Sequence, residues 1–131
     1  MLSNEELLQM AKDASKNSYC VYSNFAVGAC ALYESGKAYI GCNVENSSYG
    51  LALCAERSAI SHAIAMGEKS NLLKIAIFSP KSTKCFPCGA CRQWLQEFAN
   101  DVNIEIILEN DDKECCSYFI NDIFPYSFKF V

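Results

Sequence analysis

The sequence predicts a three-layer α/β/α sandwich with a mixed five-stranded sheet, formed as a single domain over residues 1–131. Segments of strand and helix character alternate along the chain, which is typical of a sheet covered on both faces. A short acidic turn at residues 109–112 permits an antiparallel final pair of strands. No repeat and no linker divides the chain, whose 131 residues suit one hydrophobic core.

The N-terminal part predicts a helix followed by two strands. Ser3 and Glu6 have the spacing of a capping box, and apolar residues follow at helical intervals, so we expect a helix that ends near Asn17. Residues 25–33 and 37–43 have strand character. A tight turn that contains a glycine joins them, which predicts a hairpin.

The rest of the chain predicts two helices and three strands. An alanine-rich helix over residues 54–66 should stop at Gly67. A proline and a glycine at residues 87–89 break the chain before a second, short helix over residues 90–98. The three expected strands are largely apolar, as buried strands are, and comprise residues 72–78, 102–108 and 115–120.

Charge and composition favour a small substrate. The net charge is −4 and the 11 Lys and Arg residues are scattered, so the chain offers no basic surface for a polynucleotide. No apolar run approaches the length of a membrane span. We therefore expect neither nucleic acid nor a membrane as a partner.

Nine cysteines in so short a chain raise the question of disulfides. The count is odd, and the N-terminus lacks the basic and apolar regions of a secretion signal, so we expect a cytoplasmic protein with reduced thiols. Five of the cysteines are then expected to be small apolar packing residues: Cys20, Cys30, Cys42, Cys115 and Cys116.

Cys54, Cys88 and Cys91 are the candidate ligands of a zinc ion. Cys54 opens one predicted helix and the other two open the next, where the positive end of the helix stabilises a thiolate. Cys88 and Cys91 are three residues apart, so both side chains face the same way. Three thiolates leave the fourth position of tetrahedral zinc open to water, as catalytic zinc sites require.

Glu56 is the candidate catalytic residue. It follows Cys54 by two residues, so on a regular helix it would not share the ligand's face, and we expect it to carry protons rather than bind metal. Without the cysteines it would be an ordinary first-turn glutamate favoured by the helix dipole. Arg57 lies three residues after Cys54, where it can hydrogen-bond a ligand sulfur and offset the negative charge. Arg92, which follows Cys91, is a second candidate for that role.

A structural site with four cysteine ligands is the alternative. Cys85, Cys88 and Cys91 recur every third residue, and with Cys54 they would close the coordination of zinc. Against this, the intervening Phe-Pro pair would have to fold Cys85 back toward the metal. His62 lies eight residues beyond Cys54, too far along the helix to share the metal, and we expect it to pack or to lie at the surface.

Four blocks of sequence resemble those of cytidine deaminases of the short homotetrameric kind, in order and over nearly the whole chain. A lone Cys-x-x-Cys is common, whereas these four at their spacings are specific. They are residues 22–29 (YSNFAVGA), 41–46 (GCNVEN), 54–57 (CAER) and 87–93 (PCGACRQ). The resemblance implies hydrolytic deamination of cytidine and deoxycytidine, with zinc-activated water as the nucleophile and Glu56 as base and then acid.

The resemblance also implies contacts to a nucleoside. Asn43 and Glu45 match the pair that holds the ribose 3′-hydroxyl; by themselves they would be a polar pair at a strand end. Phe25 matches the aromatic residue that packs against the pyrimidine, although core packing alone would also explain it. The backbone N–H of Ala55, at a helix start, can donate to the base carbonyl.

Other matched positions imply a homotetramer with active sites at subunit interfaces. Ser47 and Tyr49 match positions that approach the 5′-hydroxyl across an interface, and Phe128 matches an aromatic residue that reaches a neighbour's base pocket. The dense aromatic residues of the tail suit burial between subunits. They could equally cap the core of their own subunit.

Three other functions stay open at this point. The same chemistry could act on another amino-heterocycle such as blasticidin S, a nucleotide or guanine, but the Asn43 and Glu45 pair favours a free nucleoside. A zinc-stabilised structural or interaction module without turnover would need Cys85 and be indifferent to changes at Glu56. A polynucleotide editor is disfavoured by the net charge.

Overall fold

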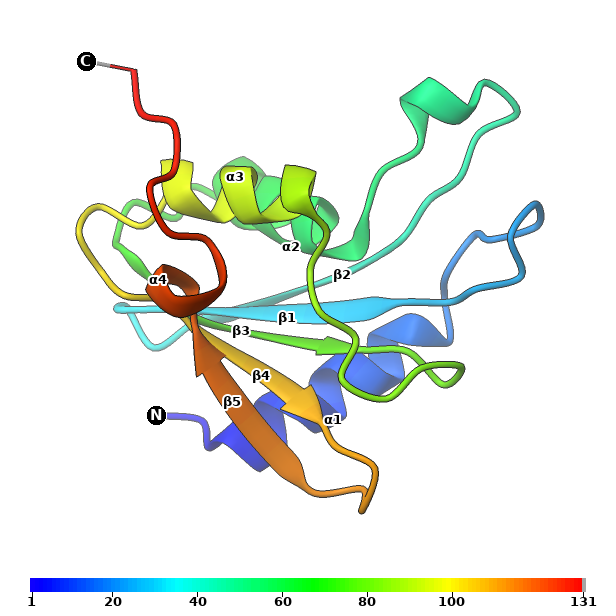
Figure 1. Ribbon diagram of the computed structural model, residues 1–131, viewed down its shortest axis with the longest axis horizontal. Helices are drawn as coiled ribbons and strands as arrows, with labels where there is room; N and C mark the ends of the chain where they lie inside the picture. Colours follow the sequence, from blue (N-terminus) through cyan, green and yellow to red (C-terminus); the bar gives the residue numbers. More distant parts are fainter. Residues whose placement is uncertain (131) are drawn as a thin grey trace.

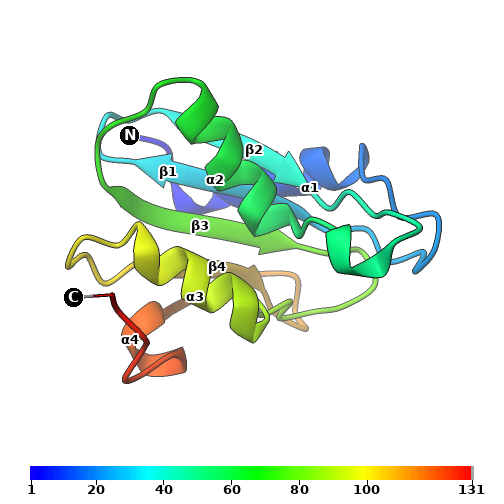
Figure 2. The ribbon, with the colours of Figure 1, turned by 90° about the horizontal axis from the view of Figure 1, so that it is seen from above.

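The computed structural model describes residues 1–130. One sheet is covered by helices on both faces, and the layers are visible in two perpendicular views (Figures 1 and 2). Helix α1 (Asn4–Ser15) packs on one face, while α2 (Ala55–Ala65) and α3 (Gly89–Glu97) lie on the other. None of the helices within residues 1–130 combines the length and apolar character that crossing a bilayer requires.

The sheet has five strands in the order β2-β1-β3-β4-β5. Strands β3 and β4 run parallel and the other neighbours run antiparallel, so the predicted mixed sheet and layered fold are confirmed. The strands are β1 (Gly28–Tyr33), β2 (Ala38–Cys42), β3 (Leu72–Phe78), β4 (Glu105–Glu109) and β5 (Cys115–Phe119).

The two core layers follow from side-chain alternation along the central strands. In β3, Ile75 and Ile77 join the cluster under α2 and α3, whereas Ala76 joins the cluster under α1. In β4, Ile106 joins the cluster under α2 and α3, and Ile107 joins the cluster under α1. Strands buried on both faces read as continuous apolar runs, which is why the sequence predicts them well.

Local signals set the first helix. Ser3 Oγ accepts from Glu6 N–H at 3.1 Å, and the Glu6 carboxylate accepts from Ser3 N–H at 3.1 Å. The predicted capping box is thus confirmed. The helix buries Leu7 and Ala11 against the sheet.

Two glycines let the helices approach the sheet closely. A Cβ at Gly28 would lie 1.9 Å from the Ala11 carbonyl oxygen of α1. A Cβ at Gly41 would lie 2.3 Å from the Ala59 nitrogen and 2.7 Å from the Ala55 oxygen, both in α2. Gly41 therefore sets the depth at which the first turns of α2 sit on β2.

Several expected boundaries were wrong. Strand β1 starts at Gly28 rather than at residue 25, because the backbone of Phe25 is bonded to side chains and not to a neighbouring strand. Strand β4 starts at Glu105 rather than at residue 102, after left-handed backbone at Asn100 and Asp101. The final strand ends one residue before the expected residue 120.

Two short helices were not predicted, η1 (Tyr49–Leu51) and α4 (Ile120–Ile123). Segments of three and four residues are too short to show a helical period in the sequence. Helix η1 lies in the long excursion between β2 and α2, and α4 opens the C-terminal segment that runs alongside α3 (Figure 1).

Candidate metal centre and active site

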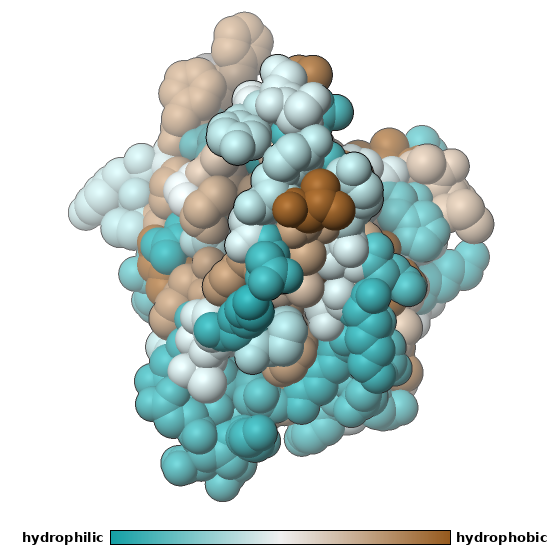
Figure 3. Space-filling model, turned by 90° about the vertical axis from the view of Figure 1, so that its right-hand side faces the viewer, coloured by the Kyte–Doolittle hydropathy of each residue, from teal (hydrophilic) through white to brown (hydrophobic). Residues whose placement is uncertain are grey.

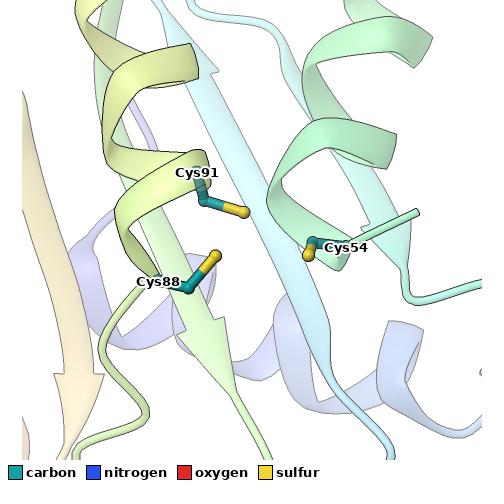
Figure 4. Close-up of side chains that lie close together, drawn as sticks. All are labelled: Cys54, Cys88 and Cys91. Atoms are coloured by element: carbon teal, nitrogen blue, oxygen red, sulfur yellow. The ribbon is translucent and has the colours of Figure 1, made fainter. Parts of the chain in front are cut away.

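Three cysteine side chains converge between the starts of α2 and α3. Cys54 is the N-cap of α2, Cys88 is the N-cap of α3, and Cys91 lies one turn into α3. Their sulfur atoms all lie within 4.8 Å of one another, and Figure 4 shows the side chains pointing toward a common centre. The helix starts predicted from the sequence thus bring the three thiols together.

The donor set fits zinc. Thiolates are the soft ligands that zinc prefers, and three of them leave one tetrahedral position for a fourth ligand. Both N-caps also place thiols at the positive ends of helices, which stabilises their ionised forms. Cys91 is buried, Cys54 is half-buried and Cys88 is exposed, so the centre lies at the edge of the core and opens toward the surface.

Hydrogen bonds polarise this cluster. The pKa of Cys54 is lowered to about 5, chiefly by a hydrogen bond from the Cys91 thiol and further by the Arg57 guanidinium. The same contact, together with burial, raises the pKa of Cys91. Arg57 Nη2 donates to Cys54 Sγ at 3.0 Å, the contact expected from its spacing.

Glu56 is buried beside the cysteines, with 5% of its surface exposed. Burial raises its pKa to about 6, and the negative charge of Cys54 acts in the same direction. Its carboxylate is not part of the cluster of potential ligand atoms. A carboxyl group with a pKa near neutrality can both accept and release a proton, which is what a proton carrier needs.

Arg92, Cys85 and His62 lie outside the cluster of sulfur atoms. Arg92 donates from Nε to the Pro87 carbonyl at 2.8 Å and from Nη1 to the Ile123 carbonyl at 2.5 Å. Cys85 packs against the apolar core, and burial raises its pKa to about 11. The His62 Nδ1 atom lies 3.0 Å from the Ile40 carbonyl oxygen, and the ring packs edge-on against a tyrosine.

Asn43 and Glu45, the expected sugar contacts, are both held by the chain itself. Asn43 Oδ1 accepts from Val27 N–H at 2.9 Å and from the Ser18 hydroxyl. Glu45 Oε1 accepts from two backbone N–H groups, those of Tyr22 and Ser23, at 3.0 Å each. These bonds fix both side chains before any ligand binds.

Ser23 is a functional candidate that sequence reasoning missed. Its hydroxyl bonds Glu45 Oε2 and also accepts from Phe25 N–H at 3.0 Å. The Ser23 hydroxyl and its backbone N–H lower the pKa of Glu45. The available signal was the position of Ser23 inside the first sequence block, beside Tyr22 and Phe25.

A pocket of about 320 Å³ lies against Glu45. It is lined by Tyr22, Ser23, Glu45, Asn46, Tyr49 and Ala52. The structure therefore brings Glu45 and Tyr49 to one cavity, while Ser47 is exposed close by.

Phe25 is half-buried near this region, and Ala55 is buried at the first turn of α2. Phe128 belongs to a different part of the structure. Its carbonyl accepts from Gln93 Nε2 of α3 at 2.9 Å, and the residue is 71% exposed. Within this chain, Phe128 is therefore not brought to the pocket beside Glu45.

The loops around this pocket expose apolar residues. Figure 3 shows their side of the molecule, where surface of intermediate hydropathy surrounds a few strongly apolar residues in the upper half and strongly hydrophilic surface fills most of the lower half. Val21 is 64% exposed, Tyr49 77% and Leu51 72%. Large apolar side chains gathered at one end of a molecule are typical of an interface.

A sandwich whose two helix starts carry three thiols and a buried carboxyl defines a candidate metal-dependent enzyme. Residues 1–106 match the family model described as the cytidine and deoxycytidylate deaminase zinc-binding region. The chain belongs to this family.

Relatives and solved structures agree with that membership. A probable cytidine deaminase of Dictyostelium discoideum is 38% identical over 126 residues, 93% of this chain and 84% of the relative. A cytidine deaminase of Sporosarcina psychrophila is 43% identical over 96 residues, 73% of this chain and 70% of the relative. A crystal structure of cytidine deaminase from Burkholderia pseudomallei matches with a TM-score of 0.89 and 38% identity, covering 97% of this chain and 100% of that one.

Proposed function

We propose that this protein catalyses the hydrolytic deamination of cytidine and deoxycytidine, giving uridine or deoxyuridine and ammonia. The observation that carries the proposal is the convergence of three thiols beside the buried carboxyl of Glu56. The family's zinc-binding region and the relatives that bear the name cytidine deaminase support the same reaction. Water is consumed, and the bond between C4 and the exocyclic amine breaks.

Cys54, Cys88 and Cys91 would hold the zinc ion. Bound there, zinc supplies the Lewis acidity that makes water a nucleophile at neutral pH. Glu56 takes up the proton that the water loses and delivers protons to ring N3 and to the departing amine. Its burial beside the three thiols, outside the set of potential ligand atoms, supports this role.

The nucleoside is expected to lie along the loops that precede α2. Asn43 and Glu45 would bind the 3′-hydroxyl, and Phe25 would pack against the base. Ala55 N–H would donate to the base carbonyl, since the first N–H groups of a helix have no partner within it. The pocket beside Glu45 supports this placement of the sugar.

We propose a homotetramer in which neighbouring subunits complete each site. The exposed apolar side chains of residues 19–22 and 49–51 support burial between copies. In this assembly Ser47, Tyr49 and Phe128 would reach a nucleoside across an interface. We further propose that the chain acts as a single domain in the cytoplasm, where its unpaired cysteines would stay reduced.

The test is an ultraviolet assay of deamination run beside zinc quantitation and a measurement of molecular mass in solution. The substrates are cytidine, deoxycytidine, their 5′-monophosphates and blasticidin S. We expect one zinc per chain, turnover of both nucleosides, little turnover of the others and the mass of four chains. One zinc per chain with no turnover of any substrate would instead indicate a structural zinc module.

A further inference from the structure

Ser23 hydrogen-bonds both Glu45, which is expected to bind the sugar, and Phe25, which is expected to pack on the base. Its Oγ atom donates to Glu45 Oε2 and accepts from Phe25 N–H at 3.0 Å. One hydroxyl group thus serves a carboxylate 22 residues away and a backbone group two residues away.

The carboxylate of Glu45 is bound on both of its oxygen atoms. Oε1 accepts from the N–H groups of Tyr22 and Ser23 at 3.0 Å, and Oε2 accepts from the Ser23 hydroxyl. Together these bonds fix the rotation of the carboxylate plane. A carboxylate has about four acceptor positions, so about one remains for a ligand hydroxyl, and Glu45 lines the pocket.

The backbone of Phe25 is held from both sides. Its N–H donates to Ser23 Oγ at 3.0 Å, and its carbonyl accepts from Asn43 Nδ2 at 2.8 Å. Asn43 Oδ1 is in turn occupied by Val27 N–H and the Ser18 hydroxyl. The amide orientation of Asn43 is therefore fixed, and its remaining N–H is the group that it can offer to a ligand.

We propose that Ser23 is a positioning residue that orients the Glu45 carboxylate toward the nucleoside 3′-hydroxyl and so sets discrimination for that hydroxyl. The proposal rests on the deaminase function proposed above. Ser23 acts through Glu45 and touches neither the metal ligands nor Glu56. Loss of its hydroxyl leaves Oε2 free to turn, which weakens the bond to the sugar. It also frees the Phe25 N–H, but an effect of Phe25 on the base acts on nucleosides with and without the 3′-hydroxyl alike.

The test compares two substrates that differ in the 3′-hydroxyl group. Deoxycytidine carries the 3′-hydroxyl, and 2′,3′-dideoxycytidine lacks it. The readout is the ratio of their kcat/KM values for the zinc-loaded protein. We expect Ser23→Ala to lower this ratio about tenfold, mainly by raising KM for deoxycytidine, since a hydrogen bond to a charged group is lost. Ser23→Thr keeps the hydroxyl and should keep most of the ratio.

Ser35 offers a matched control. Its hydroxyl donates to Glu68 Oε1 at 2.6 Å and accepts from Lys37 N–H at 3.3 Å, the same two kinds of bond in the turn between β1 and β2. Ser35→Ala should leave the ratio unchanged. If Ser23→Ala gives little folded protein, Ser23→Cys replaces it, because a thiol is a weak donor of similar size.

A double-mutant cycle with Glu45→Gln completes the test. Because Ser23 acts through the carboxylate, Ser23→Ala should not change the ratio further in that background. The inference fails if Ser23→Ala keeps the wild-type ratio, or if it lowers kcat/KM equally for both nucleosides. Failure of the proposed function looks different: the wild-type protein, with zinc bound, would then turn over neither nucleoside, and the inference would fall with it.

Discussion

Arg57 Nη2 donates to Cys54 Sγ at 3.0 Å, within the first turn of α2. Cys54 is the N-cap residue of the helix, and Arg57 lies three residues later, so its guanidinium reaches the sulfur. Three thiolates and one zinc dication carry a net charge of −1, so a fixed positive charge at a ligand sulfur reduces the surplus. The local geometry of one helical turn therefore couples charge balance to metal binding.

Replacement of Arg57 should weaken zinc binding. We expect Arg57→Ala to lower zinc affinity about 10- to 100-fold, the usual cost of losing a partner of a ligand. The zinc affinity of Arg57→Lys should lie between those of wild type and Arg57→Ala, because an ammonium keeps the charge but not the planar fork of donors. Competition with a coloured chelator measures the affinity. Lys69→Ala, which removes an exposed charge beyond the same helix, is the control, and an equal loss there would contradict the role of Arg57.

Glu56→Gln should separate metal binding from turnover. The amide keeps the size of the side chain but cannot carry the proton, so we expect at least about a 10²- to 10⁴-fold loss of kcat. Zinc content should stay at one per chain, because the carboxylate is outside the ligand cluster. Glu5→Gln, in the exposed first turn of α1, is the matched control. Retained turnover in a zinc-loaded Glu56→Gln protein would overturn the proposed chemistry.

Glu68 should contribute an acid-sensitive part of the stability. Its carboxylate accepts from Ser35 Oγ at 2.6 Å, Tyr39 OH at 3.0 Å and Ser70 Oγ at 2.7 Å, and these bonds lower its pKa to about 2. Because the folded pKa lies below the ordinary value of 4.5, the stabilisation is complete above pH 4.5 and is lost as the pH falls toward 2.

Thermal unfolding across pH tests this prediction. The melting temperature of Glu68→Gln should be lower than that of wild type at pH 7, and the gap should narrow between about pH 4.5 and pH 2. Glu97→Gln, an exposed substitution on α3, should show no such gap. A gap for Glu68→Gln that stayed constant over this pH range would show that its ionisation is not coupled to folding.

The parts of the fold that the sequence predicts well depend on local signals. The Ser3 capping box and strand β3, which is apolar on both of its faces, are each encoded by residues close together in the sequence. The metal site could be predicted for a related reason. Cys54 and Cys88 mark helix starts, and each start is defined within a few residues of sequence.

The parts that could not be predicted depend on contacts between distant residues. The start of β1 is set by Ser23 and Asn43, whose side chains replace strand partners for the backbone of Phe25. Glu68 forms its bonds to a turn that lies more than 30 residues earlier. No periodicity or motif marks such pairs, because a side chain's partner across the fold is decided only when the elements pack.

Gly41→Ala should disturb both the fold and the metal site. The added methyl group would lie 2.3 Å from the Ala59 nitrogen and 2.7 Å from the Ala55 oxygen, which are backbone atoms of α2 and cannot turn aside. Helix α2 must then move away from β2, at a cost of about 1–3 kcal/mol or more. The movement would carry Cys54 away from the sulfur atoms of α3, so zinc affinity should fall together with stability.

Denaturant unfolding and chelator competition on the same samples measure the two effects. Gly50→Ala is the control for stability, because a Cβ at Gly50 would meet no atom within 4 Å. A Gly41→Ala protein that unfolds more easily but binds zinc as tightly as wild type would contradict the coupling. That result would mean that α2 tilts about its N-terminal turn, so that Cys54 stays in place.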